Sequence, residues 1–148
     1  MKTLITGHRV QKLTEYSLVN IKYLIEEAFD TTFLENTTLG LSGMASGVDL
    51  YFCEEMLSRN IPYISCIPFE SQNTTMSLED SKLRQYYIDK SAETWNIRNS
   101  RMVEKADAAL VVFDGNKGGT HNVFQQLIEN KKPFVWINPV NEKLYEIV

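Results

Sequence analysis

The chain has few of the residues from which metal sites and nucleophilic active sites are most often built. Its 148 residues include two cysteines and two histidines. Cys53 and Cys66 fall in a predicted helix and a predicted strand, without the spacing of zinc ligands or of a secreted disulfide framework. We therefore expect two reduced, buried thiols, no metal and no cofactor.

Several familiar motifs are also absent. The sequence has no Gly-x-Ser-x-Gly elbow and no Cys–His pair with a residue to orient it. It has no Gly-x-Gly-x-x-Gly dinucleotide fingerprint. A Walker loop is missing too, because Lys117 precedes the glycines at 118 and 119 instead of following them. These absences disfavour a serine or cysteine hydrolase and a P-loop NTPase.

An excess of positive charge is missing as well. The net charge is −4 and the pI is near 5.2. Broad binding of nucleic acid normally needs a basic face, so we do not expect nucleic acid as a partner. No apolar run approaches the roughly 20 residues of a membrane span. The first apolar segment, at 3–6, is too short for a signal peptide, and we expect a cytoplasmic protein without membrane attachment.

What the sequence does contain is a regular alternation of predicted strands and helices. Strands are expected at residues 3–6, 37–41, 62–67, 109–113 and 133–137. Helices are expected at residues 16–29, 47–59, 79–90, 96–105 and 120–130. Nearly continuous apolar strands imply parallel pairing with helices on both faces. The prediction is an α/β chain, with one domain over 1–148 built on a Rossmann-like, doubly wound, mainly parallel five-stranded sheet.

Three glycine-bearing segments follow the carboxyl ends of predicted strands, at residues 6–9, 42–49 and 114–120. In doubly wound sheets the ligand binds beyond these ends, so the three segments should converge on one crevice. A strand that ends in small residues and enters a helix presents free N–H groups and the positive end of the helix dipole. Two such junctions, at 42–49 and 114–120, predict a ligand with a phosphate and a sugar. A polar segment at 68–77 could form a further wall or lid.

The candidate ligand contacts come from these segments and from the helix at 96–105. Gly118 and Gly119 allow a phosphate to approach the backbone, and Thr120 can serve as N-cap and phosphate donor. Asp49 is interpreted either as a helix-capping carboxylate or as a sugar contact or catalytic acid. Asp114 is interpreted either as a turn residue or as a sugar contact or general base. The full set is Gly7, His8, Arg9, Ser42, Gly43, Gly47, Asp49, Arg98, Asp114, Gly118, Gly119 and Thr120.

Several of these motifs resemble a known group. Residues 42–49, Ser-Gly-Met-Ala-Ser-Gly-Val-Asp, look like the Ser-Gly-x-Ala-x-Gly-Ile-Asp signature of the DprA/Smf DNA-processing proteins. Arg-Asn-x-x-Met at 98–102, Ala-Asp-Ala at 106–108 and Gly-Gly-Thr at 118–120 are similar to a motif series of the Lonely Guy (LOG) phosphoribohydrolases. Both groups belong to the SLOG superfamily of Rossmann-like nucleotide-binding domains.

Within that superfamily the chain is most similar to the small, stand-alone YpsA-like proteins. The likeness lies in Thr-Gly-His-Arg at 6–9, Ile-Pro-Phe at 67–69 with Gln72, and Asp-Gly at 114–115. The resemblance spans residues 3 to about 138 and implies a pocket for a nucleotide or nucleotide-derived ligand.

The chain also departs from these families. LOG enzymes follow Gly-Thr with a Glu pair that includes the catalytic acid, whereas this chain has Asn122 and Val123 at the matching positions. Arg98 does match the catalytic arginine of that family. DprA-type proteins carry extra domains and bind single-stranded DNA, but this chain has neither the extra length nor the basic balance.

Three functions therefore remain as hypotheses. The first is binding of a nucleoside phosphate, ADP-ribose or a related nucleotide by a sensor or sequestering protein. The second is a LOG-like N-glycosidase acting on nucleoside 5′-monophosphates, with Asp49, Asp114 and Arg98 as its catalytic residues. The third is a DprA-like accessory protein for nucleic acid, which the net charge of −4 disfavours. A homodimer is the default expectation for the assembly.

Overall fold

The computed structural model describes residues 1–67, 84–88 and 95–148. The strands of these residues are β1 (Lys2–Gly7), β2 (Leu39–Ser42), β3 (Tyr63–Ile67), β4 (Arg84–Ile88), β5 (Ala108–Val112), β6 (Phe134–Asn138) and β7 (Lys143–Ile147). The helices are α1 (Val10–Leu13), α2 (Leu18–Thr31), the 3₁₀ helix η1 (Phe33–Asn36), α3 (Val48–Ser58), α4 (Trp95–Lys105) and α5 (Gly119–Glu129). In this part of the chain, no helix is long and apolar enough to cross a bilayer.

All of these strands join one sheet, in the order β4-β3-β2-β1-β5-β6-β7. The strands β1 to β6 pair in parallel, and β7 runs antiparallel to β6. The chain builds outward from β1 through β2 to β4 and then returns to the other side of β1 with β5. The strand order therefore reverses between β1 and β5, and the fold is the Rossmann-like, mainly parallel one that the sequence predicts.

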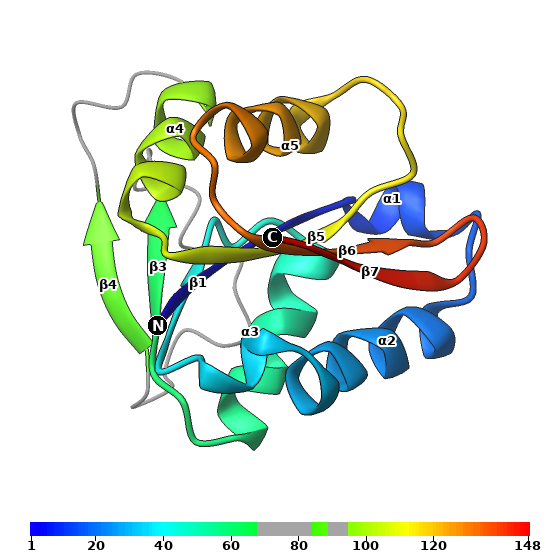
Figure 1. Ribbon diagram of the computed structural model, residues 1–148, viewed down its shortest axis with the longest axis horizontal. Coiled ribbons are helices and arrows are strands. Elements are labelled where there is room, and N and C mark those ends of the chain that lie inside the picture. The colour runs from blue at the N-terminus through cyan, green and yellow to red at the C-terminus, as the bar shows by residue number, and fades with distance from the viewer. Residues whose placement is uncertain (68–83, 89–94) are drawn as a thin grey trace.

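Helices cover both faces of the sheet (Figure 1), with α4 and α5 on one side and α2 and α3 on the other. Strand β5 shows how the sequence produces these two layers, because all of its residues are buried. Ala108, Leu110 and Val112 pack into the core beneath α2 and α3. Ala109 and Val111 pack into the core beneath α4 and α5. Alternate residues of a central strand thus supply both cores.

The expected count of five strands is too low. The predicted helix at 79–90 is wrong over 84–88, where the chain forms β4 and pairs along its whole length with β3. Its Arg-Gln-Tyr-Tyr-Ile sequence is rich in residues that favour strands, and the neighbouring strand supplies the hydrogen-bonding partners.

The second additional strand, β7, follows β6 through a short connection and forms a hairpin with it. Its sequence is Lys-Leu-Tyr-Glu-Ile, and it lies at the edge of the sheet. The expected wall or lid at 68–77, with Pro68, Phe69 and Gln72 of the YpsA-like pattern, lies outside the described residues.

Candidate functional site

A cavity of about 550 Å³ opens at the carboxyl ends of β1 and β5, where the strand order reverses. Four stretches of the described chain line it: the end of β1 with α1, the loop before α3, the first turns of α4 and the loop that enters α5. The lining residues are Ile5, Thr6, Gly7, His8, Arg9, Lys12, Ala45, Asp49, Asn96, Arg98, Asn99, Met102, Asn116, Lys117, Gly118, Gly119 and Thr120.

Most of the predicted site residues line this cavity, and they are Gly7, His8, Arg9, Asp49, Arg98, Gly118, Gly119 and Thr120. Ser42, Gly43, Gly47 and Asp114 are not among its lining residues. Sequence reasoning missed Lys12, Asn96 and Asn116 as site residues. Asn99 and Met102 belong to the Arg-Asn-x-x-Met pattern, which gave the available signal for them.

The junction at 115–120 has the geometry expected of an anion site. Gly118 is the N-cap of α5, and its carbonyl accepts the first helical hydrogen bond from Asn122 N–H. The N–H groups before Asn122 therefore precede the helical ladder. Gly115 and Gly118 have φ of 93° and 154°, a backbone region that favours glycine. A Cβ added at Gly118 or Gly119 would meet nothing within 4 Å, so a ligand can approach this backbone.

The junction at 42–49 differs from the α5 junction, because the protein itself supplies the acceptors for three of its N–H groups. Met44 N–H donates to Ser42 Oγ at 3.1 Å, and Ala45 N–H donates to Asp49 Oδ2 at 3.2 Å. Val48 N–H donates to the His8 carbonyl at 3.2 Å. The short side chains of Ser42 and Asp49 thus cap this turn from within. The predicted ligand contacts at this junction stay a prediction.

Gly7 and Gly43 serve close packing around the cavity. A Cβ at Gly7 would lie 2.6 Å from Val48 Cγ1, so glycine is required where β1 passes the start of α3. A Cβ at Gly43 would lie 2.7 Å from Arg98 Nη1, so any larger residue there would displace that guanidinium. Gly47 has φ of 97° and caps α3. These glycines shape the wall, which explains why the sequence carries them.

Arg98 lies in the cavity wall and is only 7% exposed. Its Nη1 donates to the carbonyls of Gly43 and Cys66 at 3.1 and 3.0 Å, and its Nε donates to Asn99 Oδ1 at 2.9 Å. These bonds tie α4 to the ends of β2 and β3. The guanidinium is thus held by protein oxygens, and we interpret Arg98 as a residue that positions the wall.

Asp49 presents a buried carboxyl group to the same cavity. Burial raises its pKa to about 6, although the charges of Arg98 and Arg9 and the hydrogen bond from Ala45 N–H act in the opposite direction. Burial also lowers the pKa of Arg98, against the attraction of Asp49. Both pKa shifts have the same cause: the free energy lost when the two charged groups leave water exceeds the free energy gained from their mutual attraction.

Asp114 lies behind the cavity wall with a fully buried side chain. It accepts from Tyr16 OH at 2.8 Å and from Asn116 N–H at 2.9 Å. Burial acts to raise its pKa, but the bonds from Asn116 and Tyr16 and the neighbouring His8 together lower it to about 2. Asp114 N–H donates to His8 Nε2 at 3.1 Å, and burial lowers the pKa of His8. Asp114 therefore orients His8, which does reach the cavity.

The positions that match the LOG Glu pair do not line the cavity. Val123 is 1% exposed and packs in the core beneath α4 and α5. Asn122 Oδ1 accepts from Gln126 Nε2 at 2.7 Å, along the surface of α5. A glutamate at 123 would place its carboxyl group in that apolar core, so this substitution alone would not bring a carboxyl group into the cavity.

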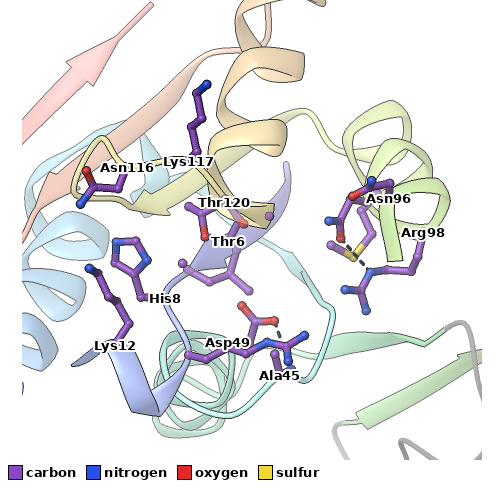
Figure 2. Close-up of a pocket in the computed structure, with 17 residues that line it drawn as sticks. Thr6, His8, Lys12, Ala45, Asp49, Asn96, Arg98, Asn116, Lys117 and Thr120 are labelled. Atoms are coloured by element: carbon purple, nitrogen blue, oxygen red, sulfur yellow. Dashed lines mark hydrogen bonds between the residues drawn. The ribbon is translucent and has the colours of Figure 1, made fainter. Parts of the chain in front are cut away.

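Side chains from different elements occupy the two ends of the cavity (Figure 2). His8, Lys12 and Asn116 lie at one end, and Asn96 and Arg98 lie at the other, with Thr6, Asp49 and Thr120 between them. The Lys117 side chain extends away from the centre. Among the described residues, no group of three or more His, Cys, Asp or Glu side chains could hold a metal ion.

Comparison with known proteins finds similarity to solved structures. No family model matches the chain, and no curated protein matches it. DprA from Streptococcus pneumoniae aligns over 91% of this chain and 49% of its own length, with a TM-score of 0.65 and 16% identity. The chain therefore shares the fold of this DprA protein. It spans about half the length of that DprA protein.

Two further solved structures share this fold. DprA from Helicobacter pylori, whose structure was solved for its single-stranded DNA binding mode, aligns over 96% of this chain and 70% of its own, with a TM-score of 0.61 and 17% identity. TM1055, a structural genomics target, aligns over 90% and 71%, with a TM-score of 0.57 and 14% identity. At these identities the likeness shows the fold, and it confirms the architecture that the SLOG resemblance implies.

Proposed function

We propose that the chain binds a nucleoside phosphate, ADP-ribose or a related nucleotide in this cavity, as a sensor or sequestering protein. The observation that carries the proposal is the α5 junction, where glycines and the start of an 11-residue helix open onto a cavity at the switch point of the sheet. The cavity volume of about 550 Å³ suits such a ligand.

The phosphate would lie against Gly118, Gly119 and Thr120. Arg9 and Lys12 line the same cavity and would balance its charge. Asp49 and the Thr6 hydroxyl at the centre would contact the sugar. Ser42, Gly43, Gly47 and Arg98 would act indirectly, because they build the wall that holds Asp49 in place.

Native mass spectrometry of the purified protein identifies a retained nucleotide. Calorimetric titration with nucleoside monophosphates, ADP-ribose and the matching nucleosides then measures what the phosphate contributes. We expect the phosphorylated compounds to bind and the nucleosides to bind more weakly. Failure of every phosphorylated compound to bind would contradict the proposal.

Gly119 offers a matched series that tests the phosphate position. A Cβ fits at this position in the free protein, so Gly119→Ala, Gly119→Asn and Gly119→Asp should all fold. Asn and Asp have the same shape, and only Asp adds a charge. We expect Gly119→Asp to bind at least about 10-fold more weakly than Gly119→Asn, since a carboxylate repels phosphate. Equal affinities of the Asn and Asp variants would place the phosphate elsewhere.

A specific observation favours a second function, cleavage of the N-glycosidic bond of a nucleoside monophosphate. The Asp49 carboxyl lies in the cavity and its pKa is raised to about 6, near the range in which a carboxyl exchanges protons at neutral pH. In this reaction Asp49 would take a proton from water as the oxygen adds to C1′ and the C1′–N bond breaks. The departing base nitrogen would take a proton from solvent, and Asp49 would return its own proton to solvent.

Release of free base from a panel of nucleoside monophosphates separates the two functions. Turnover by the natural protein, lost in Asp49→Asn with binding intact, would replace the sensing proposal with the glycosidase. Absence of turnover with tight binding would support the sensor or sequestering protein.

A further inference from the structure

We propose that His8 contacts the ligand as a neutral hydrogen-bond donor, through the N–H on its Nδ1, and adds no formal charge to the site. This inference rests on the proposed function and deepens it, because it assigns the proton of the ring and the kind of ligand atom that the ring recognises. Its basis is the contact that the other ring nitrogen, Nε2, makes with the wall of the cavity.

Nε2 of His8 is bound to the backbone behind the cavity wall. Asp114 N–H donates to it at 3.1 Å. A ring nitrogen that accepts a hydrogen bond carries no proton, and a neutral imidazole then has its single proton on the other nitrogen. The hydrogen-bond network therefore assigns the proton of His8 to Nδ1.

The carboxylate of Asp114 does not reverse this assignment. Its Oδ1 lies 3.4 Å from Nε2, farther away than the backbone nitrogen, and already accepts from Asn116 N–H at 2.9 Å. Its Oδ2 accepts from Tyr16 OH at 2.8 Å. A proton on Nε2 would also set two donors against each other, since Asp114 N–H points at the same atom. Nε2 thus fits its neighbours as an acceptor.

The surroundings of His8 favour an uncharged ring at neutral pH. Burial lowers the pKa of His8 from its ordinary value of 6.5. The charge of Lys12 acts in the same direction, and the charges of Asp114 and Glu15 act in the opposite one without cancelling the effect of burial. The ring therefore offers a hydrogen-bond donor rather than a cation.

The N–H on Nδ1 has no acceptor in the part of the chain that the structure describes. The His8 side chain is only 10% exposed and lines the cavity, and the ring of Phe113 packs beside it with the centroids 6.3 Å apart. Because the two ring nitrogens point in different directions and Nε2 faces the wall, Nδ1 is the nitrogen left for a group inside the cavity. A buried donor without a partner costs free energy, which a ligand oxygen would recover.

The position of the proton is measured in the free protein by ¹⁵N NMR of the imidazole rings. The chain has two histidines, so the signals that disappear in His8→Gln belong to His8 and the others to His121. We expect the natural protein at neutral pH to show a protonated Nδ1 and an unprotonated Nε2 in His8. A protonated Nε2, alone or together with Nδ1, would overturn the inference.

His8→Gln and His8→Asn separate the two contacts of the ring. The glutamine amide oxygen can replace Nε2 as the acceptor for Asp114 N–H, but glutamine has no donor at the place of Nδ1. The asparagine amide nitrogen can replace Nδ1, but the side chain is too short to reach Asp114 N–H. We expect His8→Gln to keep the stability of the natural protein in urea and to bind AMP about 3- to 10-fold more weakly.

His8→Asn should show the opposite pattern. It should unfold at a lower urea concentration, because Asp114 N–H loses its acceptor, and it should bind AMP more tightly than His8→Gln does. A His8→Gln variant that binds AMP as tightly as the natural protein would overturn the inference, because the Nδ1 donor would then contribute nothing.

Phosphate, sugar and base oxygens can all accept from such a donor, and three ligands distinguish them. AMP, adenosine and ribose 5-phosphate are titrated calorimetrically into the natural protein and into His8→Gln. A loss shared by AMP and ribose 5-phosphate alone assigns the contact to the phosphate. A loss shared by AMP and adenosine alone assigns it to the base, and a loss with all three assigns it to the sugar.

The dependence on pH separates a neutral donor from a cation. The ratio of the AMP affinities of the natural protein and His8→Gln should be the same at about pH 7 and at about pH 8.5, because a neutral ring does not titrate in this range. A ratio that falls as pH rises would show that His8 acts as a cation and would overturn the inference alone. Failure of all three compounds to bind would overturn the proposed function and the ligand contact with it.

Discussion

Replacing Asp49 by asparagine should stabilise the folded protein at neutral pH. Burial raises the pKa of this carboxyl from 3.8 to about 6. Between these values the folded protein holds the proton more tightly than the unfolded chain does. The free energy of unfolding therefore falls as pH rises from about 4 to about 6, and the cost of the buried charge is fully present above that range.

The shift sets the size of the effect. A difference of about 2 pKa units corresponds to about 3 kcal/mol at roughly 1.4 kcal/mol per unit, and the attraction of Arg98 is already contained in the shift. Asparagine keeps an oxygen that can accept from Ala45 N–H, so the turn at 42–49 should survive. We expect Asp49→Asn to match the natural protein near pH 4 and to be more stable by up to about 3 kcal/mol above pH 7.

Urea unfolding at intervals from pH 4 to pH 8 measures this difference directly. The natural protein should lose stability across the range where Asp49 ionises in the folded state, and the variant should lack that part of the dependence. A variant that is less stable than the natural protein at pH 7.5 would refute the reasoning, because it would mean that the ionised carboxyl gains more from Arg98 than burial costs.

Other substitutions test the remaining contacts around the cavity. Asp114→Asn should destabilise the protein by about 2 kcal/mol at pH 7. The pKa of Asp114 is lowered to about 2 in the folded protein, so its ionised carboxylate stabilises the fold above pH 4, and this contribution is lost as pH falls through 2. A urea unfolding curve unchanged by the substitution would contradict this prediction. Arg98→Met should cost about 2–4 kcal/mol, since the carbonyls of Gly43 and Cys66 lose their donor. Gly43→Ala should displace the same guanidinium, so the variant with both Gly43→Ala and Arg98→Met should lose little more unfolding free energy than either single variant. Additive losses in a urea double-mutant cycle would show that the two residues act separately.

The sequence is sufficient for the architecture because its central strands are buried on both faces. Ala108–Val112 supplies alternate residues to two cores, so the strand is apolar throughout and stands out. Arg84–Ile88 is different, because it begins with the polar pair Arg84 and Gln85 and becomes a strand through pairing with β3. The local pattern of this segment predicts a helix, but its pairing with β3 makes it a strand.

The location of the site also follows from the sequence, through the rule that ligands bind where strand order reverses. The roles of individual residues do not follow in the same way. Whether the N–H groups of the 42–49 turn face a ligand depends on Ser42 and Asp49, whose side chains accept from that turn. The orientation of Arg98 depends on carbonyls of Gly43 and Cys66, 55 and 32 residues away in the chain. Such contacts between distant parts of the sequence can be identified only once the fold is known.

The contrast between the two walls of the cavity has a consequence for the heat of binding. In the wall formed by β1 and α3, Val48 N–H donates a hydrogen bond to the His8 carbonyl. In contrast, a Cβ added at Gly115, Gly118 or Gly119 would meet nothing within 4 Å. Glycine backbone loses more conformational entropy than other residues when it is fixed. A ligand that fixes the 115–119 loop should therefore bind with a larger favourable enthalpy and a larger opposing entropy than one that rests on the opposite wall. Nucleotides and nucleosides of equal affinity would then differ in their calorimetric signatures.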